Sequence, residues 1–243
     1  MRFFRKLILG ILVTTGAAEA SMAADFIVVS APRHPAVTNP QGAFRPDDPQ
    51  LVGRIVSFSG STASFDGSYK ACDQTTKTAV KTSIGQLIRR IYPDRLNYGK
   101  HYIARPQDFG LARSPSALTV ATTFRCVVSR GNHGEDWTGA TLFPLGDGRW
   151  ALSLIKDQLL ILKPALGPVR ASFDCAKARS AVERTICSDR LLAGWDRSVT
   201  AAYDTGQGDL SEQRAWLAER NKCGSNKECL HESMSLRTSN LLH

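Results

Sequence analysis

The chain of 243 residues contains no cysteine before position 72 and no apolar stretch near its start that is long enough to cross a bilayer. A bacterial lipoprotein needs a cysteine at its signal cleavage site, so the sequence predicts a protein that is not a lipoprotein. The apolar run at residues 7–13 is far shorter than the ~20 residues of a spanning helix. We therefore expect no integral membrane association.

Signatures of catalysis are also missing. The sequence has no G-x-S-x-G nucleophile motif, no phosphate-binding glycine loop and no set of residues with metal-ligand spacing. It also has no dense Lys/Arg cluster with interleaved aromatic residues of the kind that binds nucleic acid. We predict a protein that is not an enzyme, has no cofactor or metal and does not bind nucleic acid.

What the N-terminus does contain is typical of a secretory signal peptide. Arg2, Arg5 and Lys6 precede the apolar run, and small residues follow it up to Ala23. This order of a basic segment, an apolar segment and small residues predicts a signal peptide at residues 1–23. Cleavage after Ala23 is favoured over the alternative after Ala20, and the mature protein is expected in the periplasm or secreted.

All the cysteines lie after this segment, and their even number in an exported chain predicts three disulfides. A metal site is disfavoured because the closest two cysteines have five residues between them and no matching second pair. The six cysteines are Cys72, Cys126, Cys175, Cys187, Cys223 and Cys229.

Composition divides the mature chain into two parts. Residues 24–163 are rich in β-branched residues and turn residues, residues 164–172 contain two prolines and a glycine and read as a linker, and residues 173–243 are rich in helix formers. The formal net charge is +9, but residues 173–243 contain ten basic and ten acidic residues. The basic excess in the first part suggests attraction to anionic envelope polymers, or simply solubility.

In residues 24–163, side chains alternate between two faces in the pattern typical of β-strands. Strands are expected at 26–30, 52–59, 61–69, 117–129, 138–145, 150–155 and 159–163, with one helix at 83–92. Six or seven strands and a helix predict a small antiparallel β-barrel or sandwich, tied by Cys72 and Cys126. The loop containing His133, Glu135 and Asp136 is interpreted as polar surface rather than a site.

Residues 173–243 are predicted to form helices, and capping residues indicate where these helices begin. Ser180 and Glu183 form a capping box, Asp189 can cap the next helix, and Ser211 is expected to cap a third. A last helix follows Gly224. The whole fold is therefore predicted as α+β, with a small all-α domain whose core is marginal without disulfides.

Residues 173–243 contain an ordered set of short motifs around four cysteines. They are Phe173-Asp174-Cys175-Ala176-Lys177-Ala178, Val182-Glu183-Arg184-Thr185-Ile186-Cys187, 191–196, Tyr203, 213–223 and Cys229-Leu230. With these motifs the segment resembles the lysozyme inhibitor LprI-like family. The resemblance implies an all-helical envelope module and, for part of the family, inhibition of lysozyme. The chain departs from the family in a shorter segment after Tyr203, in Met234 where an aromatic residue is usual, and in the missing lipid-attachment cysteine.

Cysteines can be bridged only when their Cα atoms lie within about 7 Å. Cys175 lies before the helix that Ser180 starts and can fold back over it, while Cys223 and Cys229 flank a turn. We predict Cys175–Cys187 and Cys223–Cys229, with crossed pairing as the alternative.

Three arginines are candidates for contact with a partner: Arg220, Arg184 and Arg197. An arginine could enter a glycan-cleaving cleft and pair with its catalytic carboxylates. Alternatively, Trp216 is core and Arg220 pairs with a carboxylate of the same part, which is the favoured interpretation. Two functions follow: an exported binding protein that inhibits lysozyme-type muramidases by occlusion, or a periplasmic ligand-binding or scaffold protein that acts through the β-rich part.

Overall fold

The computed structural model describes residues 24–37, 44–66, 70–97, 100–129, 137–167, 170–206 and 208–242. The predicted signal peptide at 1–23 with its cleavage site, and the predicted polar loop at 131–136, lie outside these residues. Within the described ranges, no helix is both long enough and apolar enough to cross a membrane.

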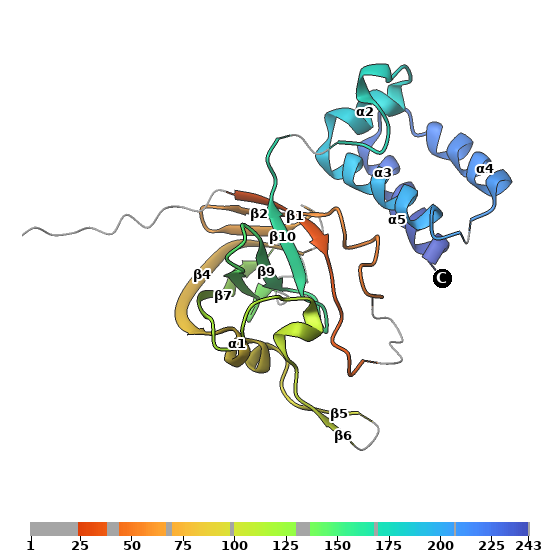
Figure 1. Cartoon of the computed structure of the whole chain (residues 1–243). Helices are drawn as coiled ribbons and strands as arrows, with labels where there is room; N and C mark the ends of the chain where they lie inside the picture. The colour runs from red at the N-terminus through yellow and green to blue at the C-terminus, as the bar shows by residue number, and fades with distance from the viewer. Residues whose placement is uncertain are drawn as a thin grey trace, which may run out of the picture.

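Eight strands form one antiparallel sheet with the pairing order β1-β10-β9-β8-β7-β4-β3-β2 (Figure 1). The order closes on itself because β1 pairs with both β10 and β2. Two further strands, β5 and β6, form a separate hairpin. The strands are β1 (Ala24–Ser30), β2 (Ile55–Ser59), β3 (Thr62–Phe65), β4 (Lys70–Ser83), β5 (Arg95–Asn97), β6 (Lys100–Tyr102), β7 (Leu118–Ser129), β8 (Thr141–Pro144), β9 (Trp150–Ser153) and β10 (Leu160–Pro164).

The alternation of side chains along β8, β9 and β10 places apolar residues on both faces of the sheet. Leu152 belongs to a cluster with Phe58 and Phe124, whereas its neighbour Ala151 belongs to a second cluster with Leu87 of helix α1 (Ile84–Ile91). Strands that are covered on both faces read as continuous apolar runs. The predicted helix is confirmed, and it forms a cover over the outer face of the sheet.

Strand β4 is the main element that the sequence did not reveal. Its residues 72–83 pair with β7, but β3 pairs only with its first three residues. The middle of β4, from Thr76 to Lys81, is exposed on both faces. An exposed strand needs no apolar alternation, so the pattern that predicts half-buried strands does not apply. The expected strand at 61–69 is shorter in the structure, since β3 ends at Phe65 and a turn follows at Asp66, while residues 67–69 lie outside the described ranges.

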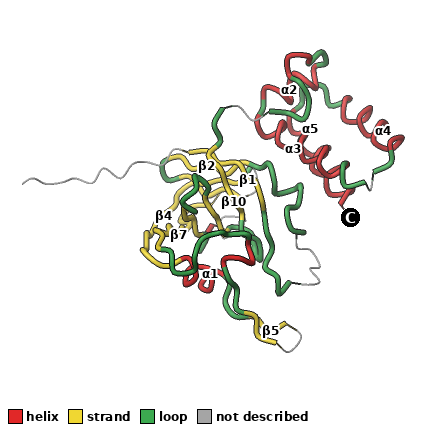
Figure 2. The backbone as a smooth tube through the Cα atoms, viewed as in Figure 1, coloured by secondary structure: helices red, strands yellow, loops and turns green. Residues whose placement is uncertain are grey.

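The remaining helices follow one another after β10 and lie together at one end of the molecule (Figure 2). Their starts confirm the capping box of Ser180 with Glu183 and the cap by Asp189. The third start was predicted wrongly, because Asp209 rather than Ser211 accepts the first backbone N–H groups. These elements are the 3-10 turn η3 (Cys175–Lys177), α2 (Ala181–Ser188), α3 (Arg190–Tyr203), α4 (Leu210–Asn221) and α5 (Lys227–Leu242).

The segment predicted as a linker is partly structured. Pro164 is the last residue of β10, and Ala171 is buried against the helices. The N–H and hydroxyl of Ser172 both donate to Asp196 of α3, at 2.7 and 2.6 Å. Only the stretch around Leu166, which is 93% exposed, has the character of a free connection.

Three disulfides join the cysteines in the predicted pairs, Cys72–Cys126, Cys175–Cys187 and Cys223–Cys229. They are typical of proteins that fold in an oxidising compartment. Over the described ranges, the architecture is thus an eight-stranded antiparallel sheet, a separate two-stranded hairpin, five α-helices and three disulfides.

We expect the disulfides to differ in their contribution to stability because they close loops of different length. Cys72–Cys126 spans 54 residues and Cys223–Cys229 spans six. Chain entropy predicts losses of about 4.2 kcal/mol and about 2.2 kcal/mol when each pair is replaced by alanine. Denaturant unfolding of the two double variants measures the loss in unfolding free energy of each. Equal losses would contradict the prediction that the longer loop contributes more.

Candidate functional site

Arg220 is buried, with 8% of its surface exposed. Its Nη1 lies 3.7 Å from Oδ1 of Asp196, and its guanidinium stands 5.3 Å from the ring centre of Trp216. Desolvation lowers the pKa of Arg220, and the carboxylates of Asp196 and Glu183 oppose this shift. These contacts match the favoured interpretation, in which Arg220 joins α4 to α3.

The other two candidate arginines lie in different surroundings. Arg197 is half-buried, and its Nη2 donates a hydrogen bond of 3.2 Å to the carbonyl of Gly53, in the loop before β2. Arg184 is exposed, and its guanidinium donates to the carbonyl of Arg179. The structure therefore does not bring the three side chains together, and only Arg184 faces solvent.

Helix α3 contacts the sheet end through a residue that the sequence analysis missed, Arg54, which lies directly before β2. Its side chain is fully buried, and its guanidinium carbon lies 3.2 Å from the ring centre of Trp195. Its Nη2 donates to the hydroxyl of Ser198 at 2.7 Å, and its Nε donates to the carbonyl of Gln50 at 3.1 Å. One side chain at the entry to β2 thus contacts the ring of Trp195 and the hydroxyl of Ser198 on α3.

Asp66 supplies the counter-charge. Its Oδ2 lies 3.0 Å from Nε of Arg54, and its Oδ1 accepts the N–H of Ile55 at 3.0 Å. Asp66 adopts a left-handed backbone with φ of 57°, which asparagine and aspartate tolerate better than other L-residues. Burial lowers the pKa of Arg54 to about 10 and raises the pKa of Asp66, while the ion pair opposes both shifts.

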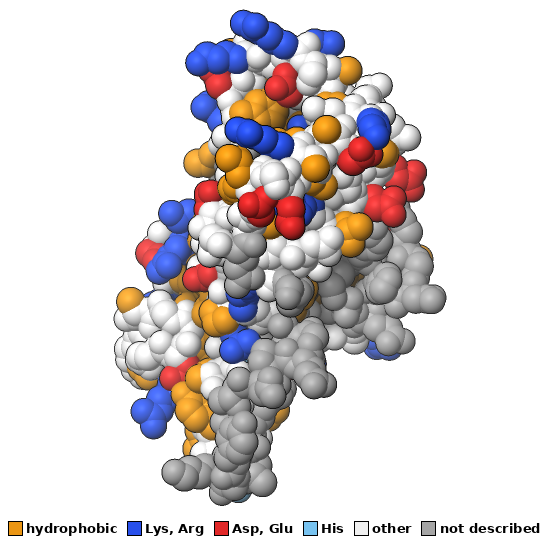
Figure 3. All heavy atoms as spheres, turned by 90° about the vertical axis from the view of Figure 1, so that its right-hand side faces the viewer, with side chains coloured by type: hydrophobic (Ala, Val, Ile, Leu, Met, Phe, Trp, Pro, Cys, Tyr) orange, Lys and Arg blue, Asp and Glu red, His pale blue; other side chains and the backbone are white. Residues whose placement is uncertain are grey.

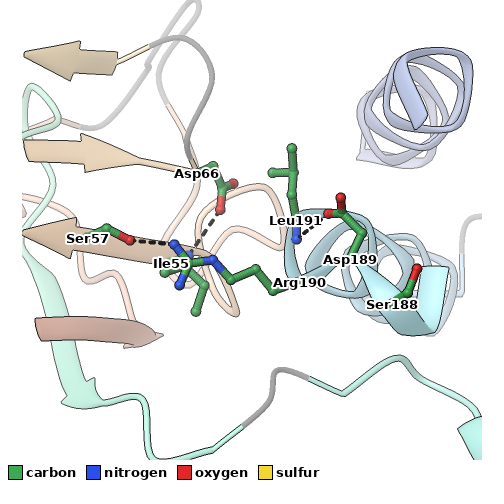
Figure 4. A pocket seen from close by; sticks show the side chains of 7 residues that line it. All are labelled: Ile55, Ser57, Asp66, Ser188, Asp189, Arg190 and Leu191. Atoms are coloured by element: carbon green, nitrogen blue, oxygen red, sulfur yellow. Dashed lines mark hydrogen bonds between the residues drawn. The ribbon is translucent and has the colours of Figure 1, made fainter. Parts of the chain in front are cut away.

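Beside this pair, a pocket of about 360 Å³ opens between β2 and the α2–α3 corner (Figure 4). Arg190 reaches across it from α3, with its Nη1 paired to the carboxylate of Asp25 and its Nη2 donating to Ser57 at 2.9 Å. A second pocket of about 300 Å³ lies against the same arginine and is lined by Asp25, Ala165 and Cys187, among others. We call these two spaces the junction groove.

The charged side chains of the junction groove form ion pairs with other side chains of the protein. Asp189 is held by Lys227 at 2.9 Å, while Arg54 and Arg190 are held by Asp66 and Asp25. Of the residues described as lining the groove, none is a histidine or lysine that could act as a base toward a serine. Its charged and hydroxyl groups can bind a polar group.

The interior of the closed sheet is filled by aromatic side chains. Phe58 stacks on Phe124 with ring centres 5.2 Å apart and meets Trp137 edge-on at 5.9 Å. Phe26 meets both Phe58 and Trp150 edge-on. None of these rings is among the described residues that line the junction groove, the pocket at the β8–β9 turn or the pocket beside Tyr92. This packing argues against an apolar ligand inside the sheet.

The described residues contain no group of three or more His, Cys, Asp or Glu side chains that could hold a metal ion. No protein-family model, curated protein or solved structure matches the chain. The site is therefore interpreted from its own geometry.

We expect Arg54→Met to lower the free energy of unfolding by about 3–5 kcal/mol, because it leaves the Asp66 carboxylate buried without its cation. The double variant R54M/D66N should recover most of this loss, since neither charge then remains. Arg190→Met is the control, because its pair with Asp25 is half-exposed and should contribute at most about 1 kcal/mol. A double variant no more stable than R54M, measured by denaturant unfolding, would contradict the pairing.

His231 should make the helices less stable in acid. It packs edge-on against Trp195 at 5.5 Å, and burial together with the charge of Arg54 lowers its pKa below 6.5. A folded-state pKa below the unfolded one gives stability that is present above about pH 6.5 and lost as the pH falls. We expect His231→Gln to reduce the drop in unfolding free energy between about pH 7 and about pH 5.

The matched control is His101→Gln, because the imidazole of His101 is exposed and pairs only with Asp94 at the surface. Urea unfolding at each pH gives the free energies. Identical pH profiles for the parent protein and H231Q would show that His231 does not carry this dependence.

Proposed function

We propose that this chain is an exported, non-catalytic binding protein of the bacterial envelope and that it inhibits lysozyme-type muramidases. In this proposal, residues 1–23 are a signal peptide cleaved after Ala23, and the mature protein stays in the periplasm or is secreted. The sheet forms a small β-barrel domain, and residues 173–243 form a disulfide-stapled all-α domain of the LprI-like type.

The observation that carries the proposal is the exposed Arg184 on a segment that the Cys175–Cys187 disulfide fixes. The backbone before α2 is held further, since the carboxylate of Glu183 accepts the N–H groups of Arg179 and Ser180 at 2.8 and 2.9 Å. A segment fixed in this way loses little conformational entropy on binding.

The chemistry of the target fits an arginine. Glycoside hydrolases of this class use two carboxylates that flank the scissile bond. A guanidinium can pair with a carboxylate through two parallel hydrogen bonds, so it is suited to occupy such a cleft. Lys177, Arg179 and Arg184 are all exposed on this segment, and Lys and Arg side chains gather at the helical end of the molecule in Figure 3.

Charge over longer distances also favours the helical part as the contact surface. Many lysozymes are basic, so a strongly positive partner would be repelled during approach. Residues 173–243 are formally neutral, whereas residues 24–172 contain 18 basic and 11 acidic residues. The helical part can therefore approach a basic enzyme and still present a local arginine.

The second candidate is a periplasmic ligand-binding or scaffold protein that acts through the sheet. The filled interior weighs against an enclosed ligand. The basic excess of residues 24–172 favours surface attraction to anionic envelope polymers instead.

The test uses the oxidised mature chain, residues 24–243, in an assay of cell-wall lysis by lysozyme. We expect the parent protein to slow lysis, and Arg184→Glu to raise the inhibitory concentration at least about tenfold, which corresponds to about 1.4 kcal/mol. The charge reversal places a carboxylate against the carboxylates of the cleft. Arg89→Glu, at an exposed arginine of α1, is the matched control and should inhibit as the parent does.

An R184E variant that inhibits as well as the parent would remove Arg184 from the contact. If the parent protein has no effect at micromolar excess on several lysozyme types, the inhibitor proposal fails. Retention of the mature chain on purified wall polymer, reversed by salt, would then favour the second candidate.

A further inference from the structure

A pocket separate from the junction groove lies at the turn between β8 and β9. It has a volume of about 290 Å³ and is lined by two chain segments, residues 111–113 and the turn from Leu145 to Arg149. Leu111 and Leu145 are 2% and 3% exposed and are anchored in the core beneath α1. They give the pocket an apolar wall that the rest of the fold holds in place.

Asp147, the one carboxylate among the described residues that line this pocket, is already neutralised. Oδ2 of Asp147 lies 2.7 Å from Nε and 2.6 Å from Nη2 of Arg149, and Oδ1 accepts the backbone N–H of Arg149 at 3.1 Å. These hydrogen bonds hold the pKa of Asp147 below its usual range. Asp147 and Arg149 therefore form a closed unit across the turn, and Asp147 stays ionised.

Arg113 is the second guanidinium of the pocket, and it is half-buried. Among the residues that the structure describes, no carboxylate or carbonyl accepts a hydrogen bond from it. It lies over Gly146, where a Cβ atom would be 3.1 Å from its Nη1. Gly146 also has a φ of 84°, so glycine serves both the turn and the close approach of Arg113.

The lining charges sum to one positive charge, from two guanidinium groups and one carboxylate. An unpaired, half-buried guanidinium is stabilised by an anion that accepts two parallel hydrogen bonds. A single carboxylate balances the charge, whereas a phosphate dianion would leave the pocket negative beside Asp147. The apolar wall of Leu111 and Leu145 suits a small apolar group next to the anion.

We propose that this pocket, which we call the Arg113 pocket, binds the carboxylate of a small ligand that carries an apolar group beside it. The C-terminal carboxylate of a short peptide and the acid group of a lactyl sugar share this chemistry. The assignment is independent of lysozyme inhibition, because no residue of the helical part lines the pocket.

The experiment is an NMR or calorimetric titration of the oxidised chain 24–243 at neutral pH. The probes are N-acetyl-alanyl-alanine, its neutral C-terminal amide, N-acetylmuramic acid and inorganic phosphate. We expect at least one of the two carboxylate probes to bind, and the amide and phosphate to bind at least about tenfold more weakly. The stronger of the two carboxylates identifies the source of the ligand.

Arg113→Gln should weaken carboxylate binding at least about tenfold, and Arg113→Lys should restore it only in part because lysine lacks the planar fork. Arg89→Gln on α1 is the matched control and should bind as the parent does. Thermal unfolding checks that each variant is folded. Should R113Q be unfolded, R113K supplies the comparison. Phosphate or the amide binding as well as the acids, or an unchanged affinity in a folded Arg113 variant, would overturn the proposal.

Discussion

The buried contact of Arg54 with Asp66 and Trp195 is the interaction on which the arrangement of sheet and helices depends. Removing two charges from water costs several kcal/mol per ion, and this cost is offset only where the geometry is good and the remaining donors are bonded. Here the ion pair, the ring of Trp195, the hydroxyl of Ser198 and the carbonyl of Gln50 surround one guanidinium, of which only Nη1 has no hydrogen-bond partner among the described residues. Because these groups come from both the sheet and α3, the contact specifies one placement of the helices.

This constraint also decides which arginines are available to a partner. Arg197 lies beside the same contact and donates to Gly53, so it belongs to the junction. Arg220 is enclosed with Asp196 and Trp216. Arg184 lies in the first half of α2, on the segment that the Cys175–Cys187 disulfide closes, and its side chain remains exposed. Arg197 and Arg220 make contacts within the fold, so the proposed inhibitory surface is built on Arg184.

The two parts of the molecule stabilise themselves by different means. The sheet buries aromatic rings inside and a second apolar layer beneath α1, which is a large core for its size. The helical part buries one smaller cluster and carries two of the three disulfides. A small core gives little stability by itself, and cross-links that restrict the unfolded chain compensate for it. Rigid surface segments, such as the one that carries Arg184, follow from this construction.

Local chemistry in the sequence was enough to predict the cysteine pairs, the capping box of Ser180, helix α1 and the meander of β8 to β10, because caps, turns and apolar periodicity act over a few residues. It did not reveal β4, whose exposed residues lack alternation, or the meeting of Arg54 with Trp195, which are 141 positions apart. Nor could it rank Arg184, Arg197 and Arg220, since burial depends on which elements pack together. The sequence by itself determined the cross-links and most of the helices and strands, whereas tertiary packing decided which charges are buried, because desolvation depends on neighbours that are distant in the chain.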